Sequence, residues 1–263
     1  MNTRTISIGR SRTVVELKNL WRSRQQLGFT VLFPVMMLLL FASIFSGRVD
    51  GTTIELSQVY VAGIIGSSLM STGFVGLAIG LAVEREAGTL DRLAGTPMPR
   101  ASYFLGKIGM VLSTVALQVV VLIGIGVALF DLSLPTDVVS WLTFVWVFLL
   151  GVSSSALLGI AVGGMIADAK SAPAVVNLPF VALQFISGVF ISINLLPISL
   201  VRVSQFFPLH WICRGMRSVF LPDSFKTVEA DGSWQLGMTA IVLGAWCILG
   251  FVLCARTFRW SRR

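Results

Sequence analysis

Uncharged apolar blocks of about twenty residues recur along the chain, separated by short polar segments. Blocks of this length cross a hydrocarbon core of roughly 30 Å as α-helices, because each helical residue rises 1.5 Å. The pattern therefore predicts an all-α membrane protein with six spans. The predicted spans cover residues 27–46, 59–83, 108–130, 138–167, 173–193 and 236–255.

The segment before the first span, residues 1–26, predicts a helix with two unlike faces. Val14, Leu17, Leu20 and Trp21 recur at three- and four-residue steps, and basic or polar side chains fill the positions between them. A basic amphipathic helix of this kind is typical of a membrane surface. We expect an interfacial anchor on the inner surface, and contact with a cytoplasmic partner is a second interpretation that the pattern leaves open.

Residues 194–234 are apolar, but prolines interrupt them too often for a span. Two of the prolines suit the first turn of a short helix, which predicts helices over 197–206 and 208–220. Arginines spaced among the apolar residues favour re-entrant half-helices that dip into, or lie on, the outer leaflet. An ordinary external loop is the alternative. The prediction depends on Pro197, Arg202, Pro208, Arg214 and Arg217.

Composition supports the membrane prediction, because 12% of the residues are charged and 55% are hydrophobic. Soluble domains carry about 25% charged residues. The net charge of +8 does not indicate nucleic-acid binding, because the basic residues lie at segment ends. With the N-terminus inside, fifteen of the 20 Lys and Arg residues are cytoplasmic, including those of the tail at 257–263. The positive-inside rule thus predicts cytoplasmic ends for a plasma-membrane protein.

The sequence lacks the residue patterns of an enzyme or a metal site. No GxxxxGK[ST] motif is present, so we expect no phosphate-binding loop in this chain. The single histidine, His210, has no catalytic set around it, and beside Trp211 we interpret it as an interfacial side chain. Cys213, Cys247 and Cys254 fit no metal spacing. We expect no catalytic residue, no metal and no cofactor in the chain.

The six predicted spans contain no acidic or basic side chain through their interiors. Proton-driven carriers and ion channels need ionisable or strongly polar groups there, so both classes are disfavoured. Any transport must draw energy from another source, along a path that suits apolar or amphipathic molecules. Small-residue repeats predict close helix packing instead of chemistry. They are Gly76-xxx-Gly80 and Gly159-xxx-Gly163.

Residues 84–107 form the most specific polar segment. We expect 84–93 to continue the second span as a helix beyond the lipid, until Gly95, Pro97 and Pro99 break it. A second short helix is expected before the third span. Such a rigid elbow with charges of both signs suits docking to another protein. From the residues alone, a solvated loop between two helices is an equal alternative.

The elbow reads E-R-E-x-G-T-L-x-R-L from residue 84, followed by T-P and then R and G-K. This motif resembles the permeases of ABC-2 type exporters, including daunorubicin-resistance-like permeases. The likeness extends over the whole chain, with a basic N-terminal helix, six spans, the S-G-V-F at 187–190 and paired short external helices. His210 and Trp211 are less typical of the family at their position.

The resemblance implies an ABC-2 type (type V) exporter permease fold, with residues 27–256 as the transmembrane domain. Such permeases pair as homodimers or heterodimers and bind two copies of a cytoplasmic ATPase, which holds the ATP and Mg. The elbow acts as a coupling helix in a groove of the ATPase, and the N-terminal helix rests against it. The implied contact residues are Glu84, Arg85, Glu86, Gly88, Thr89, Leu90, Arg92, Pro97 and Arg100.

The sequence therefore predicts the permease subunit of an exporter that moves a hydrophobic or amphipathic compound, such as a drug or a lipid-like molecule. Three alternatives stay open. They are a permease for polysaccharide or glycolipid, a membrane scaffold without transport activity, and an intramembrane enzyme that would use His210.

Overall fold

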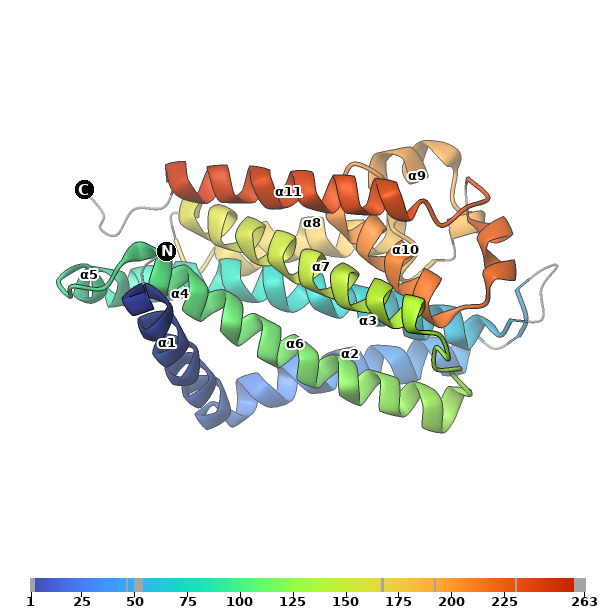
Figure 1. Cartoon of the computed structure of the whole chain (residues 1–263), viewed down its shortest axis with the longest axis horizontal. Coiled ribbons are helices and arrows are strands. Elements are labelled where there is room, and N and C mark those ends of the chain that lie inside the picture. Colours follow the sequence, from blue (N-terminus) through green and yellow to red (C-terminus); the bar gives the residue numbers. More distant parts are fainter. Residues whose placement is uncertain are drawn as a thin grey trace.

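The computed structural model describes residues 3–45, 47–49, 54–166, 168–191, 193–229 and 231–257. Within these residues the regular structure is helical, apart from one isolated bridge between Arg48 and Glu55. Most of the long helices run roughly along one axis, and the N-terminal helix lies across one end (Figure 1). The prediction of an all-α protein is confirmed.

Five helices are long and apolar enough to cross a membrane. Each coincides with a predicted span, and each owes its length to a long apolar block without a charged residue in its interior. One of them is a continuous helix that passes through α3, η1 and α4. The five are α2 (Arg24–Ile44), α3 (Leu56–Met70) with η1 (Ser71–Gly76) and α4 (Leu77–Glu86), α6 (Arg100–Phe130), α7 (Val138–Met165) and α11 (Leu236–Thr257).

The span predicted at 173–193 is instead a shorter helix, α8 (Ala172–Ile186). Its 15 residues rise roughly 22 Å, which is less than a hydrocarbon core of roughly 30 Å. Gly188 follows with a φ of 76°, in the left-handed region that favours glycine, and turns the chain away. α8 still leads from the end that holds α5 towards the end that holds α10 (Figure 1). Six full-length spans therefore stay a prediction.

The helix formed by α3, η1 and α4 occupies the centre of the bundle and packs against α7. Gly159 and Gly163 of α7 lie so close to it that an added Cβ would fall 2.5 Å and 2.7 Å from its backbone oxygens. Their predicted packing role is confirmed. Gly76 and Gly80 are different. Among the described residues, an added Cβ at Gly76 would meet only one oxygen, at 3.8 Å, and one at Gly80 would meet no atom within 4 Å. Their predicted packing role finds no partner among the described residues of this one chain and stays a prediction.

α10 (Pro208–Phe220) is inserted between α3 and α7 and is buried along almost its whole length. Close approach depends on Gly66 and Gly215, because an added Cβ at these positions would lie 2.9 Å from Cys213 and 2.7 Å from Val147. A helix is present over 208–220 as predicted and lies within the bundle, and its re-entrant placement in the outer leaflet stays a prediction. The preceding helix α9 (Ile198–Ser204) is shorter than the predicted 197–206. Two short 3₁₀ segments flank the pair, η2 (Ile193–Leu195) and η3 (Asp223–Val228).

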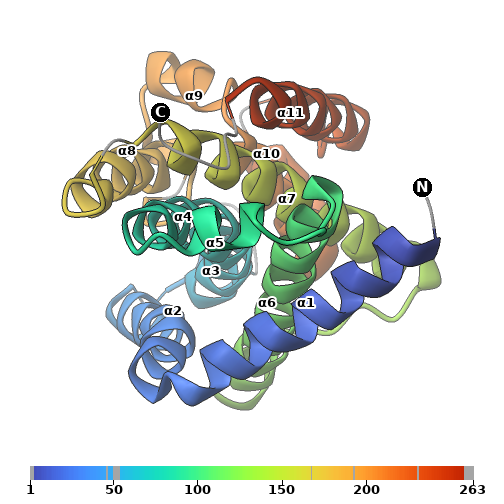
Figure 2. The same ribbon diagram turned by 90° about the vertical axis from the view of Figure 1, so that its left-hand side faces the viewer.

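The opposite end of the bundle holds α1 (Thr3–Arg22), α5 (Thr89–Ala94) and the last described residues of α11 (Figures 1 and 2). Figure 2 looks onto this end and shows α1 lying across it, in contact with the first turns of α6. The amphipathic segment predicted within 1–26 is therefore a helix, and it crosses the end of the bundle instead of extending the first span. Nothing can be said of the predicted tail beyond residue 257, which lies outside the described residues.

Candidate functional site

The elbow between α4 and α6 contains a break that the sequence pattern did not predict. α4 ends at Glu86, and Gly88 adopts a φ of 68° before α5 begins at Thr89. The continuous helix predicted over 84–93 is wrong, because the left-handed residue redirects the chain. The short helix expected before the third span is also wrong. That stretch forms the first turns of α6, which starts at Arg100.

α5 has one anchored face and one exposed face. Leu90 is buried in the main hydrophobic core, so the short helix cannot turn independently of the bundle. Asp91 and Arg92, the next two residues, are exposed and carry opposite charges. The hydroxyl of Thr96 donates to the carbonyl of Leu93 at 2.7 Å and closes the end of the helix. The result is a fixed polar surface at the tip of the elbow.

The predicted contact residues divide between this surface and the interior. Leu90 is buried, and Glu84 and Arg85 form bonds within the chain. The side chain of Arg100 lies outside the described part of the structure. Of the remaining residues, three are exposed, namely Glu86, Arg92 and Pro97. The other two, Gly88 and Thr89, are half-buried.

Lys107, near the start of α6, joins three helices. Its ammonium group contacts Glu84 at the end of α4 and lies 3.0 Å from a carboxylate oxygen of Glu16 on α1. Tyr103, one turn earlier, donates its hydroxyl to the other carboxylate oxygen of Glu84 at 2.8 Å. Arg12 pairs with Glu16 at 2.7 Å, so two carboxylates meet two cations. We call these residues the α5-end cluster: Arg12, Glu16, Glu84, Tyr103 and Lys107.

Small residues of α6 let α1 approach closely enough to form this cluster. An added Cβ at Gly106 would lie 2.4 Å from the side chain of Arg12, and one at Gly109 would lie 2.4 Å from that of Thr13. The hydroxyl of Ser102 also donates to the carbonyl of Thr5 on α1 at 2.9 Å. Side-chain contacts thus hold α1 on α6, in addition to the predicted binding of α1 to the membrane surface.

Two further bonds connect the elbow to the segment between α7 and α8. Arg85 donates to the carbonyl of Ile166 at 3.1 Å, and the backbone N–H of Ala169 donates to Glu86 at 3.0 Å. The elbow therefore contacts α1, α6 and the α7–α8 connection. Displacement of α5 would be transmitted to most helices at this end.

Two of the four residues predicted to face a membrane surface from α1 lie on its outward side. Trp21 is 67% exposed and Val14 is also exposed, whereas Leu17 and Leu20 are half-buried. An exposed tryptophan beside apolar and basic residues suits the headgroup region of a bilayer. Their role in membrane binding stays a prediction.

A second group of buried charges surrounds α10. Arg217 donates to both carboxylate oxygens of Glu229, at 2.6 and 3.3 Å. Arg214 contacts Asp231 at 3.2 Å and donates to the carbonyl of Ser233 at 2.7 Å. Burial alone would lower the pKa of Arg217, but the neighbouring carboxylate of Glu229 outweighs it and raises that pKa. We call these residues the α10-end cluster: Arg214, Arg217, Glu229 and Asp231.

The other predicted residues at this end have simpler positions. Pro208 is the first residue of α10, and Pro197 immediately precedes α9. Pro208 therefore starts its helix as predicted, whereas Pro197 is the cap residue just before its helix. Arg202 is exposed on α9, unlike the two buried arginines of α10.

His210 is fully buried, so its interpretation as an interfacial side chain is wrong. Its Nδ1 lies 2.9 Å from the hydroxyl of Ser204, and the indole of Trp211 donates instead to the carbonyl of Gln205 at 2.6 Å. Burial and the nearby cations Arg217 and Arg214 lower the pKa of His210 to about 3. A neutral imidazole with one hydroxyl partner serves packing better than proton transfer.

Sequence reasoning missed the acidic and basic partners that complete both clusters. Among the described residues, no group of three His, Cys, Asp or Glu side chains could hold a metal. Glu16 and Lys107 stand out only as charges within otherwise apolar or small-residue faces, and Glu229 follows α10 without any motif. Two local signals were available: the spacing of Glu16 four residues after Arg12, and the G-K pair at 106–107 that belongs to the elbow motif.

The family model described as ABC-2 type transporter matches residues 12–221. The matched region includes the elbow, the α5-end cluster and both arginines of α10. A search of curated proteins finds no match for the chain.

Proposed function

Because the chain belongs to the ABC-2 type transporter family, we propose that it is the membrane subunit of an ATP-driven exporter. As the permease of an ABC transporter, it is a multi-pass membrane protein. The proposal adds three elements to that membership. The direction is outward, the energy comes from an ATPase on a separate chain, and the cargo is a hydrophobic or amphipathic compound.

The elbow is the observation that carries the proposal. Its tip exposes Asp91 and Arg92, while Leu90 holds the same short helix in the core. Complementary charges of both signs would fix the register of a partner. A partner bound there would act on a rigid element and not on a flexible loop.

The α5-end cluster supports a route for coupling. A push on α5 would reach α4 directly, and Glu84 would pass it through Lys107 to α6 and Glu16. Because α4 is continuous with η1 and α3, the same push would act along the central helix. ATP-driven closure of the partner could in this way reorient the spans.

The lack of charge within the spans supports the cargo class. The amides of Gln118 and Gln184 are engaged with Thr72 and Ser67, at 2.9 and 2.6 Å. A charged cargo would find few partners on such a path, whereas an apolar or amphipathic one would need few. A drug or a lipid-like molecule fits better than a polysaccharide.

The assembly that we propose contains two permeases and two ATPase copies in the plasma membrane. The elbow and both chain ends face the cytoplasm, and α10 lies on the outer side. The concentration of Lys and Arg in segments at the α5 end supports this orientation. The ATP and Mg belong to the partner.

Affinity purification in mild detergent tests the docking role. Arg92→Glu reverses a charge at the elbow tip without disturbing a buried contact. We expect it to reduce the recovered ATPase activity by about tenfold, the effect of roughly 1.4 kcal/mol of binding free energy. Export of fluorescent amphiphiles from cells should fall with it.

Lys226→Glu provides the matched control, because it makes the same charge change on an exposed residue near α10. It should leave ATPase recovery unchanged. Equal recovery with both variants would contradict the docking role. Permease without any associated ATPase activity, in the host that expresses it, would favour a scaffold instead.

A further inference from the structure

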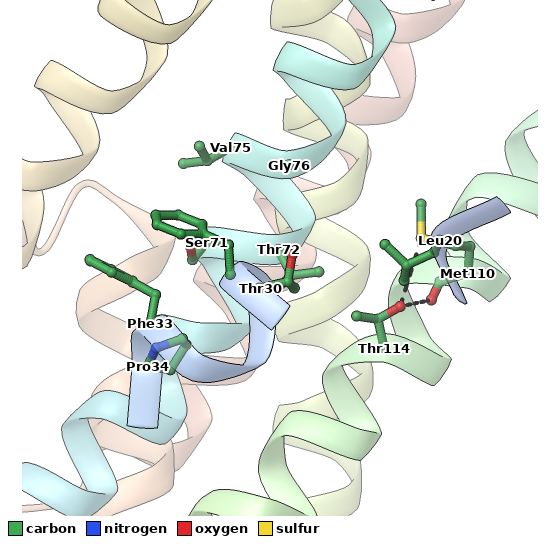
Figure 3. A pocket seen from close by; sticks show the side chains of 11 residues that line it. Leu20, Thr30, Phe33, Pro34, Ser71, Thr72, Val75, Gly76, Met110 and Thr114 are labelled. Atoms are coloured by element: carbon green, nitrogen blue, oxygen red, sulfur yellow. Dashed lines mark hydrogen bonds between the residues drawn. The ribbon is translucent and has the colours of Figure 1, made fainter. Parts of the chain in front are cut away.

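A cavity of about 170 Å³ lies between α2, η1 and α6, beside the corner where α1 meets α2 (Figure 3). Its apolar lining includes Leu20, Phe33, Val75 and Met110, one side chain from each of the four elements. An apolar cavity of about 150 Å³ is large enough for a benzene ring. The volume therefore suits one ring or a short hydrocarbon stretch and is too small for a whole drug-sized molecule.

The cavity opens towards the lipid. Two lining residues of α2, Phe29 and Phe33, are also 69% and 40% exposed on the outside of the bundle. Their rings stack with centroids 5.4 Å apart. Because α2 is a membrane span, the space beyond these rings is hydrocarbon and not water. A ligand would enter sideways from the bilayer.

The charge state of the ligand follows from the lining. None of the described residues that line the cavity is ionisable. A charged group placed there would be desolvated without a partner, at high cost in free energy. The cavity therefore discriminates in favour of a neutral molecule.

Hydroxyl groups supply the polar contacts. Thr114 donates to the carbonyl of Met110 at 2.9 Å, as threonines in membrane helices commonly do (Figure 3). The side chains of Thr30 and Ser71 form no such bond within the described part of the chain. Hydroxyls in an apolar environment are stabilised by a partner, and a ligand with a hydroxyl or carbonyl group would provide one.

The walls of the cavity are fixed by one amide. Gln118 of α6 donates to the carbonyl of Thr30 at 2.6 Å and accepts from the hydroxyl of Thr72 at 2.9 Å. α2, η1 and α6 are thus joined around the space. η1 is a π-helix, a wide turn that is frequent at functional sites.

We propose that this cavity binds the hydrocarbon part of a neutral, hydroxyl-bearing amphiphile that enters from the adjoining leaflet. This inference rests on the proposed export function and names the cargo class at the point of entry. The apolar walls would hold a ring or chain segment, and Thr30 and Ser71 would bond its neutral head.

Photolabelling of the full chain in phosphatidylcholine vesicles tests the site. The probes are a monoacylglycerol and a lysophosphatidic acid with the same diazirine-bearing chain, and the labelled residues are identified by mass spectrometry. We expect the neutral probe to label the 29–33 and 110–114 segments at least about fivefold more than the anionic probe does.

Gly76→Leu should fill the cavity and reduce this labelling about fivefold, because Gly76 lines it and an added Cβ meets only one atom, at 3.8 Å. Gly80→Leu is the matched control one turn later, where an added Cβ meets nothing within 4 Å of the described structure. It should leave labelling unchanged. Thr30→Val keeps the shape and removes one hydroxyl that would bond the neutral head, so it should reduce labelling by the neutral probe.

Two results would overturn the site. One is equal labelling in Gly76→Leu and Gly80→Leu, which indicates ordinary lipid contact. The other is equal labelling by the two probes. The vesicles contain no ATPase, so a negative result here leaves the docking of an ATPase to the Arg92→Glu experiment, and the two failures are distinguishable.

Discussion

Buried charges occur at both ends of the bundle, but the two clusters are built from different parts of the chain. In the α10-end cluster, Arg217 and Arg214 find carboxylates 12 and 17 residues later. In the α5-end cluster, Lys107 meets carboxylates 23 and 91 residues earlier. One cluster closes a local turn, and the other joins distant helices.

One ion pair of each cluster also differs from the other in access to solvent, although Asp231 at the edge of the α10-end cluster is 38% exposed. The side chains of Arg217 and Glu229 are 2% and 0% exposed, whereas that of Glu84 is 22% exposed. A sealed pair fixes a conformation, because separating it would leave a charge unpaired in an apolar interior. A partly open pair that joins three helices can respond to a partner. The comparison assigns rigidity to the α10 end and coupling to the α5 end.

The largest expected loss of stability comes from breaking the buried pair of Arg217 and Glu229. Arg217→Met leaves Glu229 buried with Arg214 as its remaining cation, 3.8 Å away and without a hydrogen bond between them, and should lower the free energy of unfolding by about 3–5 kcal/mol. Thermal unfolding in detergent measures the change. Adding Glu229→Leu removes the buried charge and should restore most of the stability. A double variant as unstable as the single one would show that the cluster does more than balance charge.

A smaller loss is expected at the α5 end. Lys107→Met should lower the free energy of unfolding by about 1–3 kcal/mol. The loss is limited because Glu16 keeps its pair with Arg12 and Glu84 is partly exposed to solvent. Hydrogen exchange on α1 should increase, and ATP hydrolysis should continue with less export. Lys170→Met, an exposed lysine at the same end, is the control. Unchanged export with Lys107→Met would contradict the coupling route.

His210 gives the sealed end a dependence on pH. Its pKa is about 3 in the folded protein, against an ordinary value near 6.5, so the unfolded state takes up the proton first. Stability is therefore full above about pH 6.5 and falls on acidification towards pH 3, by about 1.4 kcal/mol per pH unit. His210→Gln should lack this slope, so the difference in unfolding free energy between wild type and variant should shrink as the pH falls from about 6.5 towards 3. Parallel curves would show that His210 titrates normally.

Tyr103→Phe is the mildest test. It removes one hydroxyl that donates to Glu84 but leaves the ring between Arg12 and Lys107. We expect a loss of about 1 kcal/mol in stability and a modest decrease in coupled export. An effect as large as that of Lys107→Met would mean that the hydrogen bond, and not the ion pair, holds the elbow.

Hydrophobic patterning was sufficient to locate five spans and the half-helix α10, because burial in lipid or in the bundle requires long or proline-started apolar helices. It failed where one backbone conformation decides the outcome. Gly88 and Gly188 adopt positive φ values, and these turns divide the elbow and end α8 early. Glycine at such a position is visible in the sequence, but its φ is set by the contacts around it.

The site was predictable in outline and not in its partners. The motif at residue 84 placed the elbow, and Arg214 and Arg217 were recognised as unusual. The contacts of Lys107 with Glu16 and Glu84 depend on how α1 crosses α6, which no local pattern encodes. The cavity beside Gly76 also depends on how helices cross. In the sequence, the repeat Gly76-xxx-Gly80 was interpreted as a packing motif.

Thiol labelling of the elbow tests the central claim most directly. Ala94 is exposed on α5, so Ala94→Cys, in a chain whose Cys213, Cys247 and Cys254 are replaced by alanine, places one reactive thiol at the tip. A membrane-impermeant maleimide should label it in inside-out vesicles and not in intact cells, and a bound ATPase should protect it. Labelling of intact cells would contradict the account.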